Sequence, residues 1–440
     1  MTAPKSHVLT DWQPDNQEFW TATGRAIATR NLWISVPNLL LAFAIWMIWS
    51  IVVAKLKLIG FTFTTDQLFW LTALPSLSGA TLRIFYSFMV PIFGGRLWTT
   101  LSTLSLLAPA IGIGVAVQNP DTPYWVFVTL ALLSGFGGGN FASSMSNVSF
   151  FFPKKEKGNA LAINAGGGNL GVSVMQFLVP LVIASAIAAP VVGAPQVAVE
   201  KGVESHLYLQ NAGFVWVPLI IVSGLAAWFG MNDIASAKAS FATQAVVFQR
   251  KHNWLMCWLY LGTFGSFIGF SAAFPLLMKT LFPDVNSLQF AFLGPLVGAL
   301  ARVLTGWVSD KFGGEHVTHY SFIALAAGVI GVLYAVGSFG GVPSFPMFFA
   351  SFMWLFVWTG VGNASTFQMI PTIVRSDMPR IMPSSDAETR LKAAEMESAA
   401  IVGFTSAIGA FGGFFIPKAF GDSLKLTGDP STALWLFFGF

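Results

Sequence analysis

Two arginines, Arg83 and Arg302, lie in the middle of long apolar stretches of this 440-residue chain. A guanidinium placed in hydrocarbon costs several kcal/mol unless it reaches a cavity, an acidic partner or an anion. Its planar fork donates parallel hydrogen bonds, so the ligand that it fits best is a flat oxyanion. Nitrate, nitrite and carboxylates all have this shape. The alternative is a structural salt bridge inside the membrane.

The positions of the acids weaken that alternative. All 19 Asp and Glu fall in predicted loops or near the ends of apolar stretches, and those nearest to an interior are Asp66, Asp310, Glu395 and Glu397. No acid is expected at mid-membrane to neutralise either arginine. Two uncompensated positive charges therefore predict a bound anion.

The histidines, which could relay protons or act in catalysis, also lie outside the interiors of the apolar stretches. The five histidines fall in loops or at span ends: His7, His206, His252, His316 and His319. We therefore expect no proton relay in the bundle, no metal site, no cofactor and no enzymatic activity, because clustered nucleophiles, bases or ligands are missing from the spans. An empty site with two charges is costly to move through a dehydrated state, which favours exchange of anions over net uniport.

The composition sets the class of protein. Hydrophobic residues make up 55% of the chain and charged residues 10%, against roughly 25% charged in soluble domains. Apolar runs of about 20 residues recur along the chain, which predicts an all-α, multi-pass membrane protein surrounded by lipid. The net charge of +4 is small and spread over loops, so no nucleic-acid partner is expected. Cys257 is the single cysteine, which excludes an intrachain disulfide.

Windows of about 19 residues predict twelve spans. They are 33–53, 67–91, 97–117, 124–151, 158–187, 210–230, 254–278, 288–309, 317–337, 344–370, 395–417 and a segment from Ser431. The last segment is too short to cross, so we expect the chain to stop inside its final helix. The predicted division is an N-terminal segment 1–31, a six-helix half 32–231, a linker 232–253 and a second half 254–440.

The loop charges predict the orientation. Fifteen Lys and Arg fall in loops on the side of the N-terminus and six on the opposite side. Met1 to Arg30 has no pattern of a cleavable signal. The positive-inside rule therefore places the N-terminus and the linker in the cytoplasm.

The two arginines occupy equivalent positions in an internal repeat with an offset of 219 residues. Arg83 aligns with Arg302, Gly94 with Gly313, and Gly95 with Gly314. Such a repeat indicates two pseudo-symmetric halves. The stretch 306–314 resembles the loop motif of the major facilitator superfamily. The first copy has Pro91 where Asp310 would fall, so it does not predict a gate salt bridge on that side.

Two glycine-rich stretches occupy the fifth and eleventh spans. The first also contains Asn164 and Asn169, whose amides need partners inside a membrane. Small residues at four-residue spacing let helices approach closely. The glycines are Gly158, Gly166, Gly167, Gly168 and Gly171 in the first stretch, and Gly403, Gly409, Gly412 and Gly413 in the second.

At these residues the sequence resembles the nitrate/nitrite porter family, in particular its NarK-type bacterial exchangers. The two glycine-rich stretches look like the paired nitrate signature motifs of that family. The similarity extends over nearly the whole chain, through 30–35, 63–69, 86–96, 140–144, 263–272 and 365–369.

The resemblance implies a site and a function. Arg83 and Arg302 would bind the anion, Phe141 and Phe264 would hold it from opposite faces, and the pocket would also include Asn169, Tyr260 and Ser406. Without the resemblance, nothing distinguishes these two rings from the other phenylalanines, of which the chain has 43 in all.

The implied activity is nitrate/nitrite antiport by rocking of two halves, in a monomer of the bacterial inner membrane that serves nitrate assimilation. Three different activities also fit the residues. They are proton-coupled nitrate symport, transport of another small planar anion such as formate, and nitrate binding by a sensor without transport.

Overall fold

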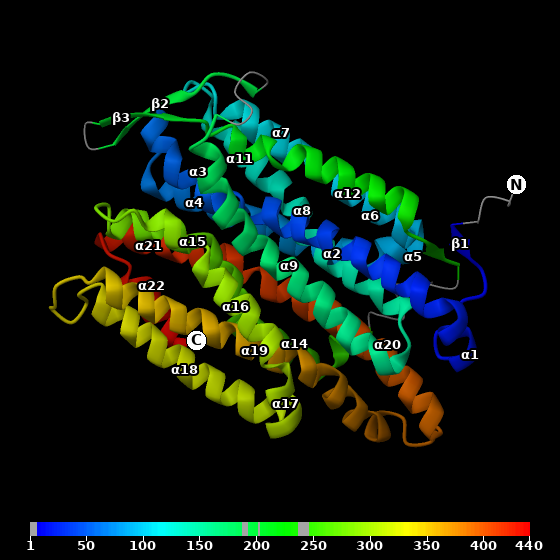
Figure 1. Ribbon diagram of the computed structural model, residues 1–440. Coiled ribbons are helices and arrows are strands. Elements are labelled where there is room, and N and C mark those ends of the chain that lie inside the picture. The colour runs from blue at the N-terminus through cyan, green and yellow to red at the C-terminus, as the bar shows by residue number, and fades with distance from the viewer. Residues whose placement is uncertain (1–6, 187–191, 201–202, 236–245) are drawn as a thin grey trace, which may run out of the picture.

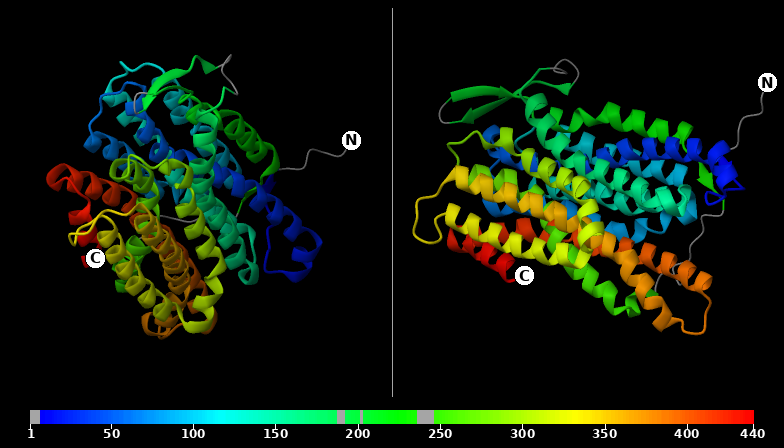
Figure 2. Two further views of the ribbon diagram at one scale, coloured as in Figure 1. Left: turned by 60° about the vertical axis from the view of Figure 1, so that its left-hand side comes forward. Right: turned by 60° about the horizontal axis from the view of Figure 1, so that its bottom comes forward.

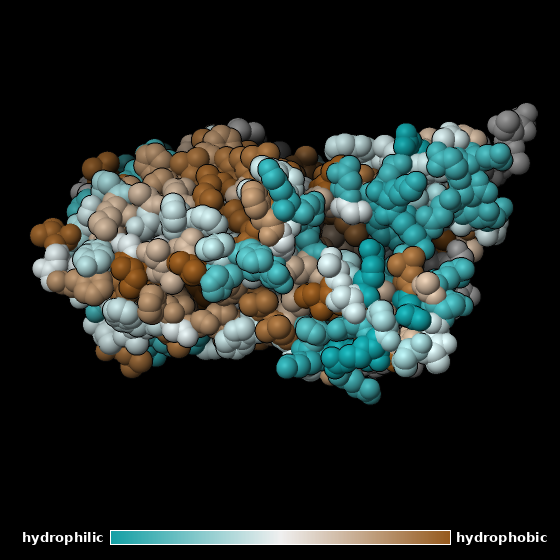
Figure 3. Space-filling view, turned by 90° about the horizontal axis from the view of Figure 1, so that it is seen from below, coloured by the Kyte–Doolittle hydropathy of each residue, from teal (hydrophilic) through white to brown (hydrophobic). Residues whose placement is uncertain are grey.

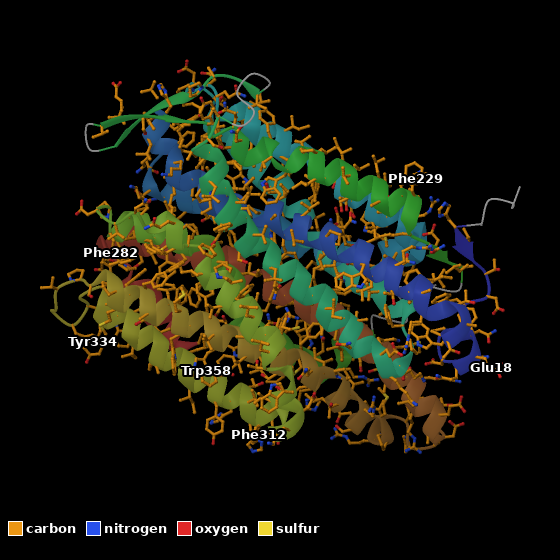
Figure 4. The ribbon with its side chains drawn as sticks, viewed as in Figure 1. Glu18, Phe229, Phe282, Phe312, Tyr334 and Trp358 are labelled. Carbon is orange, nitrogen blue, oxygen red and sulfur yellow. The ribbon has the colours of Figure 1, made fainter. Side chains whose placement is uncertain are left out.

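The computed structural model describes residues 7–186, 192–200, 203–235 and 246–440. Long helices run side by side along one axis (Figure 1). Two small sheets mark the ends of this bundle, and we call them the N-terminal end, near β1, and the hairpin end, near β2 and β3. Figure 4 shows Glu18 at the N-terminal end and Phe282 at the hairpin end.

The helices of the first half follow in chain order, including two short irregular turns. They are α1 (Gln17–Phe19), the π-helix η1 (Trp20–Gly24), α2 (Arg25–Met47), α3 (Trp49–Leu56), the 3-10 helix η2 (Lys57–Ile59), α4 (Thr65–Tyr86), α5 (Met89–Phe93), α6 (Gly95–Leu104), α7 (Leu107–Ala116), α8 (Tyr124–Phe151), α9 (Lys154–Ile183), α11 (Asn211–Phe214) and α12 (Trp216–Gly230).

The second half contains the 3-10 helices η3 and η5 and the π-helix η4. Its elements are η3 (Val246–Gln249), α14 (Lys251–Tyr260), η4 (Leu261–Gly265), α15 (Ser266–Leu281), η5 (Ser287–Phe290), α16 (Leu293–Leu304), α17 (Gly306–Phe312), α18 (Gly314–Ala335), α19 (Phe345–Ile381), α20 (Ala387–Ala410), α21 (Gly412–Thr427) and α22 (Ser431–Gly439).

Ten continuous helical segments among the described residues are long and apolar enough to cross a membrane. The pair Leu288–Leu304 and Gly306–Phe312, bent by 43°, makes up to eleven. These eleven correspond in order to the first eleven predicted spans. The helix at the twelfth position, α22, has 9 residues, whereas a crossing needs about 20. The structure is thus a multi-pass helical membrane protein.

Two small sheets were not predicted. Strands β2 (Gln196–Glu200) and β3 (Val203–Leu207) pair antiparallel and project at the hairpin end (Figure 2, right). Strands β1 (Val8–Leu9) and β4 (Asp233–Ile234) pair in parallel and join the N-terminal segment to the chain after α12. The predicted linker runs through 236–245, which lie outside the described residues, as do 1–6, so the domain division stays a prediction.

The helix that carries Arg83 has a defined start. The Thr64 hydroxyl accepts from the Gln67 N–H at 3.2 Å, and the Gln67 side chain accepts from the Thr64 N–H at 2.8 Å. This capping box satisfies two of the amides left free at the start of α4.

The 219-residue repeat reappears as the same backbone turn in both halves. Gly94 has a φ of 86° and Gly313 a φ of 85°, and each directly precedes a helix, α6 or α18. L-residues with side chains rarely adopt this region, which explains why glycine stands at both positions.

The two halves meet along the middle of the bundle. Helix α21 packs on α4, α16 on α9, α15 on α3, and α20 on both α4 and α8. From below, apolar and intermediate residues cover most of the body, and hydrophilic residues gather towards the N-terminal end (Figure 3). An apolar flank with polar residues gathered towards one end is the surface expected of a chain surrounded by lipid.

Candidate anion-binding site

Arg83 is fully buried at the contact between the halves. Its Nε donates to the Gly138 carbonyl oxygen on α8 at 2.7 Å, and its Nη1 donates to the Ser406 carbonyl oxygen on α20 at 2.9 Å. Its Nη2 has no hydrogen-bond partner among the described residues. Two carbonyls therefore fix the guanidinium and leave one amino group for a ligand.

Three aromatic rings surround the Arg83 guanidinium. Its Cζ lies 4.7 Å from the Phe141 ring centre, 5.0 Å from Trp46 and 5.2 Å from Phe264. The Trp46 indole donates to the Pro75 carbonyl oxygen at 2.9 Å, which holds its ring in place. A desolvated cation on an aromatic face gains about 2 kcal/mol. The rings thus offset part of the cost of burying this charge.

Arg302 lies on α16 and is 9% exposed. Its Cζ is 5.5 Å from the Phe367 ring, and its Nη1 has no hydrogen-bond partner in the described part of the chain. The Tyr260 ring lies 5.8 Å from Phe367 and stacks on Phe264 at 5.1 Å. A continuous row of rings therefore connects Arg302 with Arg83.

Tyr260 is buried between the two cations. Its hydroxyl interacts electrostatically with Arg83 and Arg302 and lies near enough to the Arg302 side chain for a weak hydrogen bond, but none of good geometry is formed among the described residues. The two guanidiniums also repel one another. An anion between them would relieve this repulsion and accept from all three groups.

Phe264 is placed by an irregular turn. The π-helix η4, Leu261–Gly265, interrupts the run from α14 to α15 and carries this ring. A Cβ on Gly412 of the neighbouring helix would lie 2.3 Å from the Gly265 Cα, so the two backbones nearly touch. π-helical turns inside α-helices occur frequently at functional sites.

The rings of Phe141 and Phe264 come from opposite halves and face one another. Their centres lie 6.3 Å apart and their planes differ by 27°. A flat ion between two rings needs about 7 Å, twice the usual contact distance of about 3.5 Å. The ring centres are closer than this, so the two rings would have to part to admit such an ion.

The remaining two predicted pocket residues differ in whether their side chains have a hydrogen-bonding group free for a ligand. Asn169, on α9, is fully buried, and neither of its amide atoms has a partner among the described residues. The Ser406 hydroxyl, in contrast, donates to the Gly403 carbonyl oxygen at 2.8 Å. Ser406 therefore contacts Arg83 through its backbone carbonyl, while its hydroxyl is engaged within its own helix.

The glycines of the two glycine-rich stretches differ in how much room there is for a Cβ. A Cβ on Gly171 would lie 2.1 Å from the Leu40 carbonyl oxygen, and one on Gly409 would lie 2.6 Å from the Tyr260 ring. Side chains also leave no free room for a Cβ at Gly166, Gly167, Gly168 and Gly413. Gly403 has only an ordinary contact at 3.6 Å, and Gly158 has nothing within 4 Å. Close packing therefore explains all of these glycines except Gly158 and Gly403.

Acids near the span ends pair with other cations. Glu395 lies 3.3 Å from the Lys154 Nζ, and Glu397 forms a bidentate pair with Arg250 at 2.6 and 2.7 Å. Among the described residues, no carboxylate is in an ion pair with Arg83 or Arg302.

In the first copy of the loop motif, Arg96 pairs with an acid from another part of the chain. The Arg96 N–H donates to Asp233 Oδ1 at 2.8 Å, and its Nε lies 3.5 Å from Asp233 Oδ2. Asp233 follows α12, so it is not part of the motif that contains Pro91. A gate salt bridge was not predicted here because the motif itself lacks the acid.

Two rings of the site were not predicted, Trp46 and Phe367. Phe367 lies inside the stretch 365–369 that carries the family resemblance, which was the available signal. Trp46 had none, because it is one of 16 tryptophans in the chain.

The family model of the Major Facilitator Superfamily matches residues 35–417. The chain belongs to the major facilitator superfamily. A solved structure with the same fold is the partially occluded, inward-open xylose transporter XylE of E. coli, which covers 94% of this chain and 96% of its own, with a TM-score of 0.67 and 12% identity.

Relatives within the superfamily are much closer in sequence. The nitrate/nitrite transporter NarU of Salmonella typhimurium is 56% identical, covering 98% of this chain and 93% of its own. The probable nitrate/nitrite antiporter NarK2 of Thermus thermophilus is 41% identical, covering 97% and 92%. This member of the superfamily therefore groups with the nitrate/nitrite porters, and the predicted family is confirmed.

Proposed function

We propose that this superfamily member transports nitrate and nitrite across the membrane, exchanging one for the other by alternating access. The observation that carries the proposal is the pair Arg83 and Arg302. Each is buried, each belongs to a different half, and each has one amino group without a partner among the described residues. A small planar anion between them satisfies both groups.

The proposed exchange follows from charge. Without an anion, the site holds two guanidiniums that repel one another and that no described carboxylate neutralises. Moving this charge through a closed, dehydrated state is costly, and a bound monoanion lowers that cost. Return of the empty carrier is then slow, so uptake of one anion requires release of another.

The proposed binding mode uses both halves. Arg83 donates to the anion from the first half and Arg302 from the second, while the rings of Phe141 and Phe264 cover its two faces. The Tyr260 hydroxyl and the Asn169 amide supply further donors, since neither makes a hydrogen bond of good geometry in the described residues. Binding therefore draws the halves together around the anion, as alternating access requires.

Counterflow in proteoliposomes tests the exchange. Purified protein is reconstituted in vesicles loaded with nitrite, with nitrate or with neither, and uptake of labelled nitrate is measured. We expect uptake only into the loaded vesicles. Uptake into empty vesicles driven by a pH gradient would contradict exchange and favour proton-coupled symport.

Two further measurements test the range of transported anions and the presence of transport itself. Formate and other small carboxylates are added as competitors, and competition equal to that of nitrite would broaden the substrate to planar anions in general. Nitrate binding without any flux in vesicles would identify a sensor.

The proposed setting is the inner membrane of a bacterium, in a cell that assimilates nitrate. The excess of Lys and Arg in the loops on the side of the N-terminus supports a cytoplasmic N-terminal end. The site is built from one chain, which supports function as a monomer.

A further inference from the structure

Asn363 is a buried polar residue that neither the sequence patterns nor the pocket described above include. It lies on α19 and is 0% exposed. Neither its Nδ2 nor its Oδ1 has a hydrogen-bond partner among the described residues. Leaving a buried amide unpaired costs about 1–3 kcal/mol, so such a group needs an explanation.

Its neighbours on α19 show which way this residue faces. One residue of an α-helix is rotated by about 100° from the next, so Asn363 lies within about 60° of Gly360, Thr366 and Phe367 around the helix axis. These three residues contact parts of the site from different sides.

Gly360 faces the helix of Arg302. A Cβ on Gly360 would lie 3.1 Å from the Arg302 backbone nitrogen and 2.9 Å from the Ala301 Cβ. Helices α16 and α19 are therefore in close contact one turn away from Asn363.

Phe367 and Thr366 face the rings of the site. The Phe367 ring lies 5.5 Å from the Arg302 guanidinium and 5.8 Å from the Tyr260 ring. The Thr366 hydroxyl lies 3.2 Å from the hydroxyl of Thr263, which directly precedes Phe264 on η4. Asn363 thus lies on the side of α19 that faces α16 and η4, the elements that carry Arg302 and Phe264.

Three buried polar groups that make no hydrogen bond of good geometry among the described residues belong to the elements of the second half that meet here. They are the Arg302 Nη1, the Tyr260 hydroxyl and the Asn363 amide. Their coincidence beside the site indicates a shared ligand, because each group alone would carry a desolvation cost.

We infer that Asn363 is a further substrate-binding residue, whose side-chain N–H donates to the transported anion. The inference rests on the proposed nitrate/nitrite site. It adds a donor from α19 beside Arg302, and the Asn363 carbonyl oxygen can accept from Tyr260 or Arg302 at the same time. The second half then contributes a guanidinium, a hydroxyl and an amide to one oxyanion.

The test uses the full chain with the substitutions Asn363→Leu and Asn363→Asp. Leucine keeps nearly the same volume without donors, and we expect the nitrate Kd in detergent and the KM in nitrite-loaded vesicles to rise about 10- to 100-fold. Aspartate places a negative charge against the anion, and we expect nitrate binding to be lost. Asn363→Ala takes the place of the leucine variant if that variant does not give a folded protein.

Asn253→Leu is the matched control. Asn253 is also 0% exposed with both amide atoms unpaired in the described residues, but it precedes Tyr260 by seven residues on α14, about 10 Å along the helix. We expect this variant to keep the nitrate Kd and KM of the unaltered protein.

The outcomes separate the inference from the proposed function. If the unaltered protein binds nitrate and the Asn363 variants bind it equally well, the inference is overturned while the proposed function stands. A lower kcat with an unchanged Kd would assign Asn363 to the conformational change and would also overturn it. If the unaltered protein binds no nitrate, the proposed function itself fails.

Discussion

Arg83 on α4 donates from Nη1 to the Ser406 carbonyl oxygen on α20, at 2.9 Å. This hydrogen bond joins the two halves at the site itself, since the residues are 323 positions apart in the chain. A charged donor to a buried carbonyl contributes about 1.5–3 kcal/mol. The residue that we propose to bind the anion therefore also takes part in closing the halves over it.

The geometry around Arg83 predicts that lysine cannot replace it. In the unaltered protein, the Arg83 fork binds the carbonyls of Gly138 and Ser406 and still has one amino group for the ligand, and Arg83→Lys removes this fork. Arg302→Lys removes the planar group that faces Phe367. We expect nitrate counterflow to fall at least about 100-fold in both variants, because a point charge offers no bidentate geometry.

Arg25→Lys is the control for these variants. Arg25 pairs with Glu156 at 2.7 Å but its side chain is 62% exposed, so counterflow should stay within about twofold of the unaltered rate. Near-normal nitrate affinity in either site variant would refute recognition by a planar fork.

The rings of Trp46, Phe141 and Phe264 around Arg83 predict a loss of affinity for nitrate when Phe264 is replaced by a smaller residue. Phe264→Leu removes a ring that contacts both the Arg83 guanidinium and the Phe141 ring. The loss of about 1–2 kcal/mol corresponds to a rise in KM for nitrate of about 5- to 30-fold.

Phe352→Leu separates this effect from packing. Phe352 is fully buried on α19 against Phe270 and Phe274, away from the arginines. It should lower the melting temperature and leave the KM unchanged. Equal KM values for the two variants would argue against a role of the Phe264 ring in binding.

Gly409 is predicted to be required for the position of Tyr260. In Gly409→Ala, the added Cβ would lie 2.6 Å from the Tyr260 ring, so this ring, which stacks on Phe264, must shift. We expect at least tenfold slower nitrate exchange from a protein that still folds, measured as counterflow together with size-exclusion behaviour.

Gly158→Ala provides the comparison, because nothing lies within 4 Å of a Cβ at this position. Alanine is the better helix former by about 1 kcal/mol, so this variant should be as active and at least as stable. A similar loss of exchange in both variants would mean that the glycines act through backbone flexibility and not through space.

An ion cluster at the hairpin end is predicted to hold the halves together there. Asp66 on α4 lies 3.3 Å from Lys425 and 3.7 Å from Lys418, both on α21. Asp66→Asn should weaken this contact by about 1 kcal/mol, which corresponds to about fivefold more of the state open at that end.

Thiol labelling measures this opening. A cysteine replaces Ser76, which is fully buried on α4 against Gly413 of α21, in a background with Cys257→Ser. Labelling should be about fivefold faster with Asp66→Asn, and unchanged with Glu388→Gln, whose partner Lys392 lies on the same helix. Equal labelling rates with and without Asp66→Asn would show that the cluster does not hold this end closed.

The elements that could be predicted from the sequence are those fixed by local composition. The order of the spans follows from their length and apolarity, and the missing mid-membrane acids singled out the two arginines. The repeat at an offset of 219 residues also marks the same turn in both halves, because glycine accepts the positive φ angles at Gly94 and Gly313.

The features that could not be predicted depend on distant partners. Strand β2 is defined by its pairing with β3, and the Ser406 carbonyl became a ligand of Arg83 only because α20 packs on α4. The π-helix at Phe264 has no local sequence signal that separates it from the α-helices around it. Phe141 and Phe264 could be selected only through the family resemblance, since phenylalanine is common throughout the chain, and Trp46 could not be selected at all.

The 6.3 Å between the Phe141 and Phe264 rings has a consequence for what passes through the molecule. Rings this close would have to part only a little for an ion one atom thick, and by more for a tetrahedral one. Sulfate and phosphate carry the same sign of charge and would be drawn to the same arginines, yet their thickness would force the halves apart. The two rings would thus select flat anions over tetrahedral ones by their thickness, in addition to any selection by hydrogen bonds.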